Sequence, residues 1–289
     1  MITMRRSVAV GMLALVWSAF GRTNKALAAN PVNNADELVA QHLNSIASPA
    51  VRAELKTRVV HGPLHYRLVV GGAGYLDGKS ILVSDGEKFQ FFMKIASNDY
   101  DGEQIIYDGQ RDSVAFSAIR QRRSALGEFI FVQDAVIREG LLGGTLSTAW
   151  PLLNLDGRKA KLTFEGLKKM DGQKLYKLSY VPQKSTDLSI DLYFDPETCR
   201  HVETVYSLNV SSQMASNIRA AAQQVDARFT LQEKFSDFKT VNGITLPTHY
   251  NIQFSREPQS GHTVVSQWDM PGLDVSSNMP VDARNFEVK

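Results

Sequence analysis

The chain has 289 residues, with 32 lysines and arginines against 30 aspartates and glutamates. The N-terminal segment described next contains Arg5, Arg6, Arg22 and Lys25 and no acid, so the remainder carries 28 basic and 30 acidic residues, a formal charge of −2. This balance argues against nucleic acid as a partner, because such proteins need a strongly basic surface.

Residues 1–28 have the features of a secretory signal peptide. Arg5 and Arg6 form the basic start, and residues 7–21 form an apolar run that is shorter than the roughly 20 residues needed to span a bilayer. Small residues at 26 and 28 predict cleavage after Ala28. We therefore expect export to the periplasm; the alternative is an uncleaved anchor helix.

Residues 29–289 are long enough for one large domain, and we expect a single one. An exported chain whose only cysteine is Cys199 has no internal disulfide, so its core must be large enough to be stable without one. Cys199 follows a turn sequence and has no histidine at a recognisable spacing, which favours a structural thiol over a nucleophile.

An amphipathic helix is predicted to begin after Asn34. Asn34 and Glu37 have the spacing of a capping box, and Leu38, Leu43 and Ile46 lie on one stripe at helical spacing. Pro49 interrupts or ends this helix, and Lys56 is near its furthest extent.

Alternating apolar and polar residues predict β-strands through most of the remaining chain. Phe89, Phe91, Met93 and Ile95, for example, share one face of a strand. A break is expected at Gly62-Pro63. Asp-Gly and Asn-Gly pairs accept positive φ, as two-residue hairpins require. They predict turns at 77–78, 85–86, 101–102, 108–109, 156–157, 171–172 and 242–243.

The strand pattern is interrupted between about residues 119 and 152. The period is helical from Arg123 to Glu139, and an apolar, glycine-rich stretch then runs to Trp150-Pro151. We expect one or two short helices that form a lid between two blocks of strands, with a second helix or excursion at 214–225. The predicted fold is mainly β, with about eleven antiparallel strands, an N-terminal helix and an inserted helical lid.

The chain resembles the LolA-like periplasmic lipoprotein-carrier superfamily, in its outer-membrane lipoprotein-sorting branch. Three local sequences carry the resemblance, at residues 84–89, 193–198 and 238–247, where strands end in Asp-x-x-Thr or continue through Asn-Gly to Leu-Pro. The resemblance implies an incomplete β-barrel whose concave side is covered by helices and holds acyl chains. It also implies an arginine that latches the lid, for which Arg58 and Arg67 are early-strand candidates without a matching motif.

Catalytic and metal motifs are weak. His61 and His65 are separated by Gly62-Pro63, which prevents helical alignment as zinc ligands, and no Gly-x-Ser-x-Gly elbow is present. Residues 71–74 are glycine-rich but precede no helix, which favours a bulge or loose hairpin over a phosphate loop. The acidic alternation at 99–103 lacks the other ligands of a calcium loop. We expect neither a metal nor a cofactor.

The sequence therefore favours a non-enzymatic periplasmic carrier of lipid or lipoprotein acyl chains, in which a cavity lies between sheet and lid. A membrane-bound donor or acceptor protein is the further partner of such a carrier. Two alternatives remain open: an envelope-stress sensor or scaffold that binds a protein partner, and a hydrolase with dispersed catalytic residues. The expected lipid-binding residues are Phe89, Phe91, Met93, Phe116, Phe129, Leu141, Leu142, Leu146, Trp150, Leu188, Ile190 and Leu192.

Overall fold

A computed structural model describes residues 32–210, 226–259 and 261–288, so the expected signal peptide and the predicted excursion at 214–225 lie outside the described residues. Within these residues the chain forms one antiparallel sheet of 13 strands, two more than predicted. The strands are β1 (Thr57–Val70), β2 (Gly74–Asp85), β3 (Lys88–Ile95), β4 (Gly102–Tyr107), β5 (Asp112–Val114), β6 (Lys161–Met170), β7 (Gln173–Val181), β8 (Ser189–Phe194), β9 (His201–Val210), β10 (Ala227–Val241), β11 (Ile244–Pro258), β12 (Val264–Met270) and β13 (Asp274–Ser277).

Short helices lie before the sheet and between its two blocks of strands. The N-terminal pair precedes β1, five short helices follow β5, and one 3-10 helix follows β13. They are α1 (Ala35–Ile46), α2 (Pro49–Ala53), α3 (Ala125–Val132), α4 (Ala135–Arg138), η1 (Gly144–Leu146), η2 (Pro151–Leu153), α5 (Leu155–Arg158) and η4 (Ala283–Phe286). We call residues 125–158, from α3 to α5, the helical cover.

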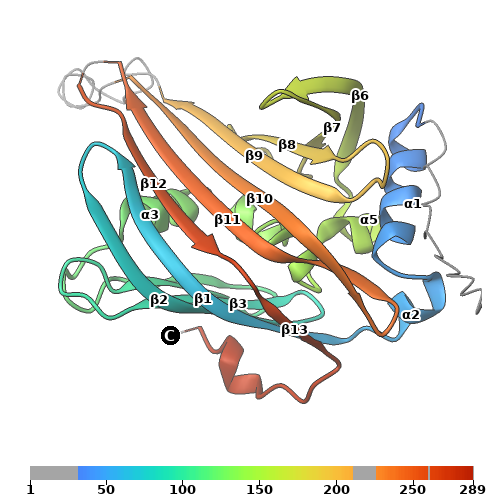
Figure 1. Ribbon diagram of the computed structural model, residues 1–289, viewed down its shortest axis with the longest axis horizontal. Helices are drawn as coiled ribbons and strands as arrows, with labels where there is room; N and C mark the ends of the chain where they lie inside the picture. Colours follow the sequence, from blue (N-terminus) through green and yellow to red (C-terminus); the bar gives the residue numbers. More distant parts are fainter. Residues whose placement is uncertain (1–31, 211–225, 260, 289) are drawn as a thin grey trace, which may run out of the picture.

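The sheet is strongly curved but not closed. Its strand order is β5-β4-β3-β2-β1-β12-β11-β10-β9-β8-β7-β6, with β13 paired to β1, so β5 and β6 are the two edges. Figure 1 shows β1–β3 and β6–β9 on either side of the green helical segment, with α1 and α2 beside the end of β9–β11. The predicted mainly β fold, an unclosed sheet with an N-terminal helix and inserted helices, is confirmed.

Strand β1 joins the two blocks of strands. Arg58–His61 pair with β13, and from His65 onward β1 pairs with β12. The expected break at Gly62-Pro63 is wrong, because β1 continues through it and stays paired with β2. On the side of β1 away from β2, none of the described strands pairs with residues 62–64, and a proline without an N–H is tolerated there.

Three of the predicted turns are wrong. Gly102 is the first residue of β4 and pairs with Lys94, so Asp101-Gly102 ends a longer loop and is not itself the turn. Asp77-Gly78 lies inside β2, and a Cβ on Gly78 would come within 2.3 Å of the Lys94 carbonyl oxygen. Asp156-Gly157 lies in α5. The hairpins at Asp171-Gly172 and Asn242-Gly243 are confirmed, with positive φ at both residues of each pair.

The N-terminal helix begins as predicted. The Asn34 side chain accepts a hydrogen bond from the Glu37 backbone N–H at 2.9 Å, and α1 ends before Pro49, which opens α2. Its stripe packs Leu38 and Ile46 against the sheet side of the molecule. Burial of this stripe, rather than helix propensity, stabilises a helix of this length.

Candidate functional site: the interface between sheet and helical cover

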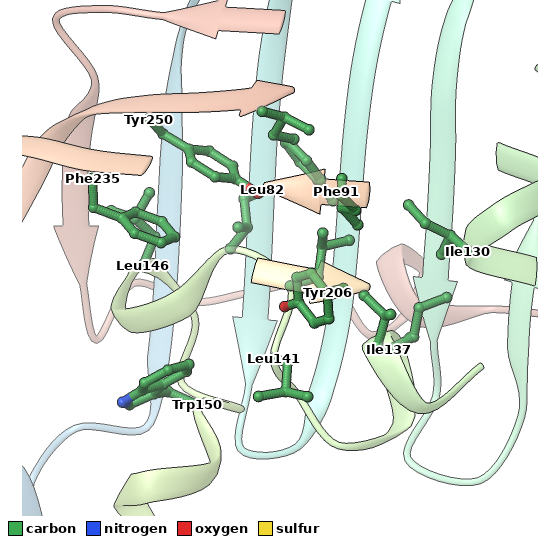
Figure 2. Packing of buried hydrophobic residues seen from close by; sticks show 14 of the residues in the cluster. Leu82, Phe91, Ile130, Ile137, Leu141, Leu146, Trp150, Tyr206, Phe235 and Tyr250 are labelled. Carbon is green, nitrogen blue, oxygen red and sulfur yellow. The ribbon is translucent and has the colours of Figure 1, made fainter. Parts of the chain in front are cut away.

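The predicted lining residues meet between the concave face of the sheet and the helical cover, with one exception. Eleven of the twelve are buried in one continuous apolar cluster. Figure 2 shows Leu141, Leu146 and Trp150 of the cover with Leu82, Phe91 and Tyr250 of the sheet. Phe116 is the exception, because it is 60% exposed on the outer surface. Whether the eleven contact lipid stays a prediction.

Glycines let the cover approach the sheet closely. Gly143 has φ +81, and a Cβ there would lie 2.7 Å from the Leu82 side chain. Gly144 has φ +50 and would meet Phe235 at 2.8 Å and His201 at 3.0 Å. Any other residue would be strained at this φ and would push the cover away.

A buried carboxylate connects the sheet to the cover. Glu233, on β10, is fully buried and accepts hydrogen bonds from the Gly143 N–H at 2.8 Å, from the Tyr206 hydroxyl at 2.6 Å and from the Tyr250 hydroxyl. Desolvation raises the pKa of Glu233 from 4.5 to about 7, although these donors favour the ionised form. The carboxylate therefore holds the glycine-rich part of the cover at the cost of its own desolvation.

A buried guanidinium makes a second connection. Arg58, on β1, is 1% exposed, and its Nη1 donates to the Thr145 carbonyl at 2.5 Å. Burial lowers the pKa of Arg58 to about 10, and its Nε has no hydrogen-bond partner. Within the described residues no carboxylate pairs with Arg58, so most of its desolvation cost is uncompensated.

The end of the cover is anchored by aromatic and imidazole rings. The Trp150 Nε1 donates to His42 Nε2 at 3.0 Å, so the His42 Nδ1 carries the proton and donates to the Cys199 carbonyl at 3.0 Å. Burial lowers the pKa of His42 from 6.5 to about 4, which keeps this ring neutral. The Trp150 ring also packs on His201, with 4.5 Å between centroids.

The start of the cover is anchored by a second buried carboxylate. Glu103, on β4, accepts from the Ser124 hydroxyl at 2.5 Å and from the Tyr100 hydroxyl at 2.6 Å. Ser124 caps α3 by accepting from the Gly127 N–H at 2.8 Å. Burial raises the pKa of Glu103 to about 7. Both ends and the middle of the cover are thus fixed to the sheet by buried polar groups.

The interior is filled in this arrangement, which differs from the expected open cavity. The void between the sheet and Leu146 is about 10 Å³, lined among others by Val60, Phe91 and Tyr250. This is close to the minimum that one water molecule occupies. An acyl chain therefore fits only if the cover moves away from the sheet or if the side chains of the cover withdraw from the interface.

The larger hollows lie outside this interface. One of about 660 Å³ is lined by α2, by the β10–β11 hairpin and by β13. Among the described residues no group of three or more His, Cys, Asp or Glu side chains is arranged to hold a metal ion. In the same part of the chain no helix is long and apolar enough to cross a membrane.

Sequence reasoning missed Glu233 and named Arg58 only as one of two candidates, without a matching motif, for the latching arginine that the resemblance implies. A signal existed for both, because alternation places Glu233 on the same face as Leu231 and Phe235, and Arg58 on the face of Val60 and Leu64. A charge on an otherwise apolar strand face indicates a buried polar contact.

Comparisons with known proteins find similar solved structures only. No family model matches the chain, and no curated protein matches it. Among solved structures, a LolA superfamily protein from Nitrosomonas europaea is 13% identical with a TM-score of 0.46, and the match covers 89% of this chain and 99% of that one.

Two further structures are similar to the same extent. A DUF1329 family protein from Desulfovibrio piger is 10% identical, with a TM-score of 0.41, and the match covers 89% of this chain and 98% of that one. A structure described as an outer membrane lipoprotein-sorting protein domain from Vibrio parahaemolyticus is 9% identical, with a TM-score of 0.42 and coverages of 86% and 95%. All three structures are thus similar to this chain at no more than 13% sequence identity and with TM-scores below 0.5.

Proposed function

We propose that the protein is a periplasmic carrier that shields acyl chains of a lipid or lipoprotein between the sheet and the helical cover, without covalent chemistry. The observation that carries this proposal is a continuous apolar interface held by two buried charged groups, Arg58 and Glu233, each without a counter-charge among the described residues. A purely structural core rarely retains such groups, because apolar residues of similar size are as stable or more stable.

The buried charges lower the cost of opening. When the cover separates from the sheet, the guanidinium of Arg58 and the carboxylate of Glu233 regain water, and this gain offsets part of the apolar surface exposed. An acyl chain then covers the exposed face. Each methylene removed from water contributes about 0.8 kcal/mol, so a chain of roughly 16 carbons contributes on the order of 13 kcal/mol.

Native mass spectrometry of the protein purified from the periplasm tests this function. We expect a fraction of the protein to carry a non-covalent adduct with the mass of a lipid or lipidated fragment, which is lost under denaturing conditions. We also expect the delipidated protein to bind a fluorescent fatty acid. A bare polypeptide mass together with no binding of the probe contradicts the proposal.

The filled interior favours a second candidate, a scaffold that binds a protein partner on its outer surface. A hollow of about 660 Å³ beside α2 and β13 offers such a partner a concave surface. A pull-down that recovers a stoichiometric envelope protein, with no lipid on the carrier, supports this candidate over the first.

A further inference from the structure

An exposed apolar and basic surface lies at the start of the helical cover. Phe116 and Ile119 precede α3, Phe131 and Val132 end it, and these four side chains are 42–61% exposed. Arg120 and Arg122 lie between them in the sequence and are also exposed. We call this surface, formed by Phe116, Ile119, Arg120, Arg122, Phe131 and Val132, the arginine-aromatic tip.

The two aromatic side chains of the tip are held in place. The Arg123 guanidinium lies 4.4 Å from the centre of the Phe116 ring and 3.5 Å from that of the Phe131 ring. Arg123 is itself fixed, because its Nε donates to the Val114 carbonyl at 2.8 Å and its Nη1 lies 3.5 Å from Glu128. Two phenyl rings are therefore presented to solvent already ordered, so binding through them costs little further side-chain entropy.

The tip is locally basic although the chain is not. Residues 115–124 contain Arg120, Arg122 and Arg123 and no acid. These three arginines line a hollow of about 460 Å³, and Arg256, from the end of β11, lines it as well. Asp99, Asp101, Glu103 and Glu128 line this hollow as well; Asp101 accepts from the Ala118 N–H, Glu103 is buried under Ser124, and Glu128 lies 3.5 Å from Arg123.

The guanidinium groups of Arg120 and Arg122 face solvent. Arg120 has only a 3.9 Å contact to Asp99, which is itself 92% exposed, and among the described residues Arg122 has no ion pair. Arg122 is therefore the cation of the tip that has no acidic partner in the described part of the chain.

We propose that the arginine-aromatic tip docks the protein on an anionic phospholipid bilayer. Apolar side chains that project beside arginines suit a membrane interface, where the rings enter the headgroup region and the guanidinium groups remain at the phosphates. A folded partner would instead need a shaped apolar surface to cover these side chains. Because α3 begins the cover, docking places the start of the cover at the bilayer, at the end of the molecule opposite α1 (Figure 1).

Vesicle flotation tests the proposal with the intact protein. Vesicles of phosphatidylcholine alone are compared with vesicles that contain about 30% phosphatidylglycerol, at low and high salt. We expect binding to the anionic vesicles only, and weaker binding at high salt.

Variants of the tip test whether this surface makes the contact with the vesicles. We expect the double variant Arg120→Gln/Arg122→Gln to bind about 25-fold more weakly, at about five-fold per arginine. We expect Phe116→Ser/Ile119→Ser to bind at least tenfold more weakly at both salt concentrations. The matched controls, Lys169→Gln/Lys174→Gln and Leu167→Ser, remove exposed cations and an exposed leucine from β6 and β7 and should bind as the wild type does.

A fluorophore attached at Ala118→Cys should shift to the blue on anionic vesicles, and one at Lys169→Cys should not. The proposal is overturned if the wild type ignores anionic vesicles, if the control variants weaken binding equally, or if the tip variants bind normally. Retention of the wild-type protein by a membrane protein but by no lipid vesicle also overturns it. Fatty-acid binding in solution is measured separately, so failure of docking is distinguishable from failure of the carrier function.

Discussion

At the scale of single residues, the most informative group is Glu233. Its carboxylate lies among Leu231, Phe235, Tyr206 and Tyr250 and receives the Gly143 N–H of the cover. Its pKa, raised by burial to about 7, means that the folded protein binds a proton more tightly than the unfolded chain does. The stability contributed by Glu233 is therefore full below pH 4.5 and is lost as the pH rises to 7.

Replacement of Glu233 by glutamine should remove this pH dependence. The difference in unfolding free energy between wild type and Glu233→Gln should change by about 3 kcal/mol between pH 4.5 and pH 7, with the wild type relatively more stable at the acidic end. The lowered pKa of His42 acts in the opposite direction, but it is common to both proteins and cancels. Chemical denaturation at several pH values measures the difference, and a constant difference across this range contradicts the assignment.

At the scale of elements, the helical cover decides whether the interior is accessible. It meets the sheet through polar contacts at Glu103, Arg58, Glu233 and His42, and its leucines fill the interior. A further contact joins the Thr148 N–H to the Ser84 hydroxyl on β2 at 2.9 Å. The carrier function requires these contacts to open together.

A disulfide across this last contact should block loading. We expect Ser84→Cys/Thr148→Cys, when oxidised, to bind a fluorescent fatty acid at least tenfold more slowly than the reduced form of the same protein. The reduced form is the matched control, and Cys199 is buried away from the oxidant. Equal loading of the oxidised and reduced forms would show that the cover does not need to move.

At the scale of the whole molecule, the sheet is continuous between the two blocks of strands. β1 pairs with β2 on one side and with β12 and β13 on the other, and β12 pairs in turn with β11. The apolar cluster also includes residues of both blocks, such as Phe91 and Leu192. We therefore propose that residues 29–289 form one cooperative domain.

Calorimetry of the processed protein should show a single transition. For roughly 260 residues we expect a heat-capacity change of about 3.5 kcal/mol/K and equal calorimetric and van't Hoff enthalpies. Two separate transitions would indicate that the strands before and after the cover unfold independently.

Local patterns were sufficient for many of the elements. The alternation of Phe89, Phe91 and Met93 placed them on the buried face of β3, and the Asn34–Glu37 capping box placed the start of α1. The hairpin at Asn242-Gly243 was also predictable. These features depend on neighbours within a few residues, so periodicity and turn chemistry are enough to predict them.

Features that depend on contacts between residues far apart in the sequence were visible only in the tertiary structure. Gly78 is required by the Lys94 carbonyl of the neighbouring strand rather than by a turn, and Phe116 lies on the outer surface beside Arg123. The meeting of Glu233 with Gly143 joins residues 90 positions apart. The sequence by itself determined the mainly β fold, the N-terminal helix and the place of the helices between two blocks of strands. Which charged groups became buried under the cover, and how completely the interior is filled, followed only from packing between segments far apart in the chain.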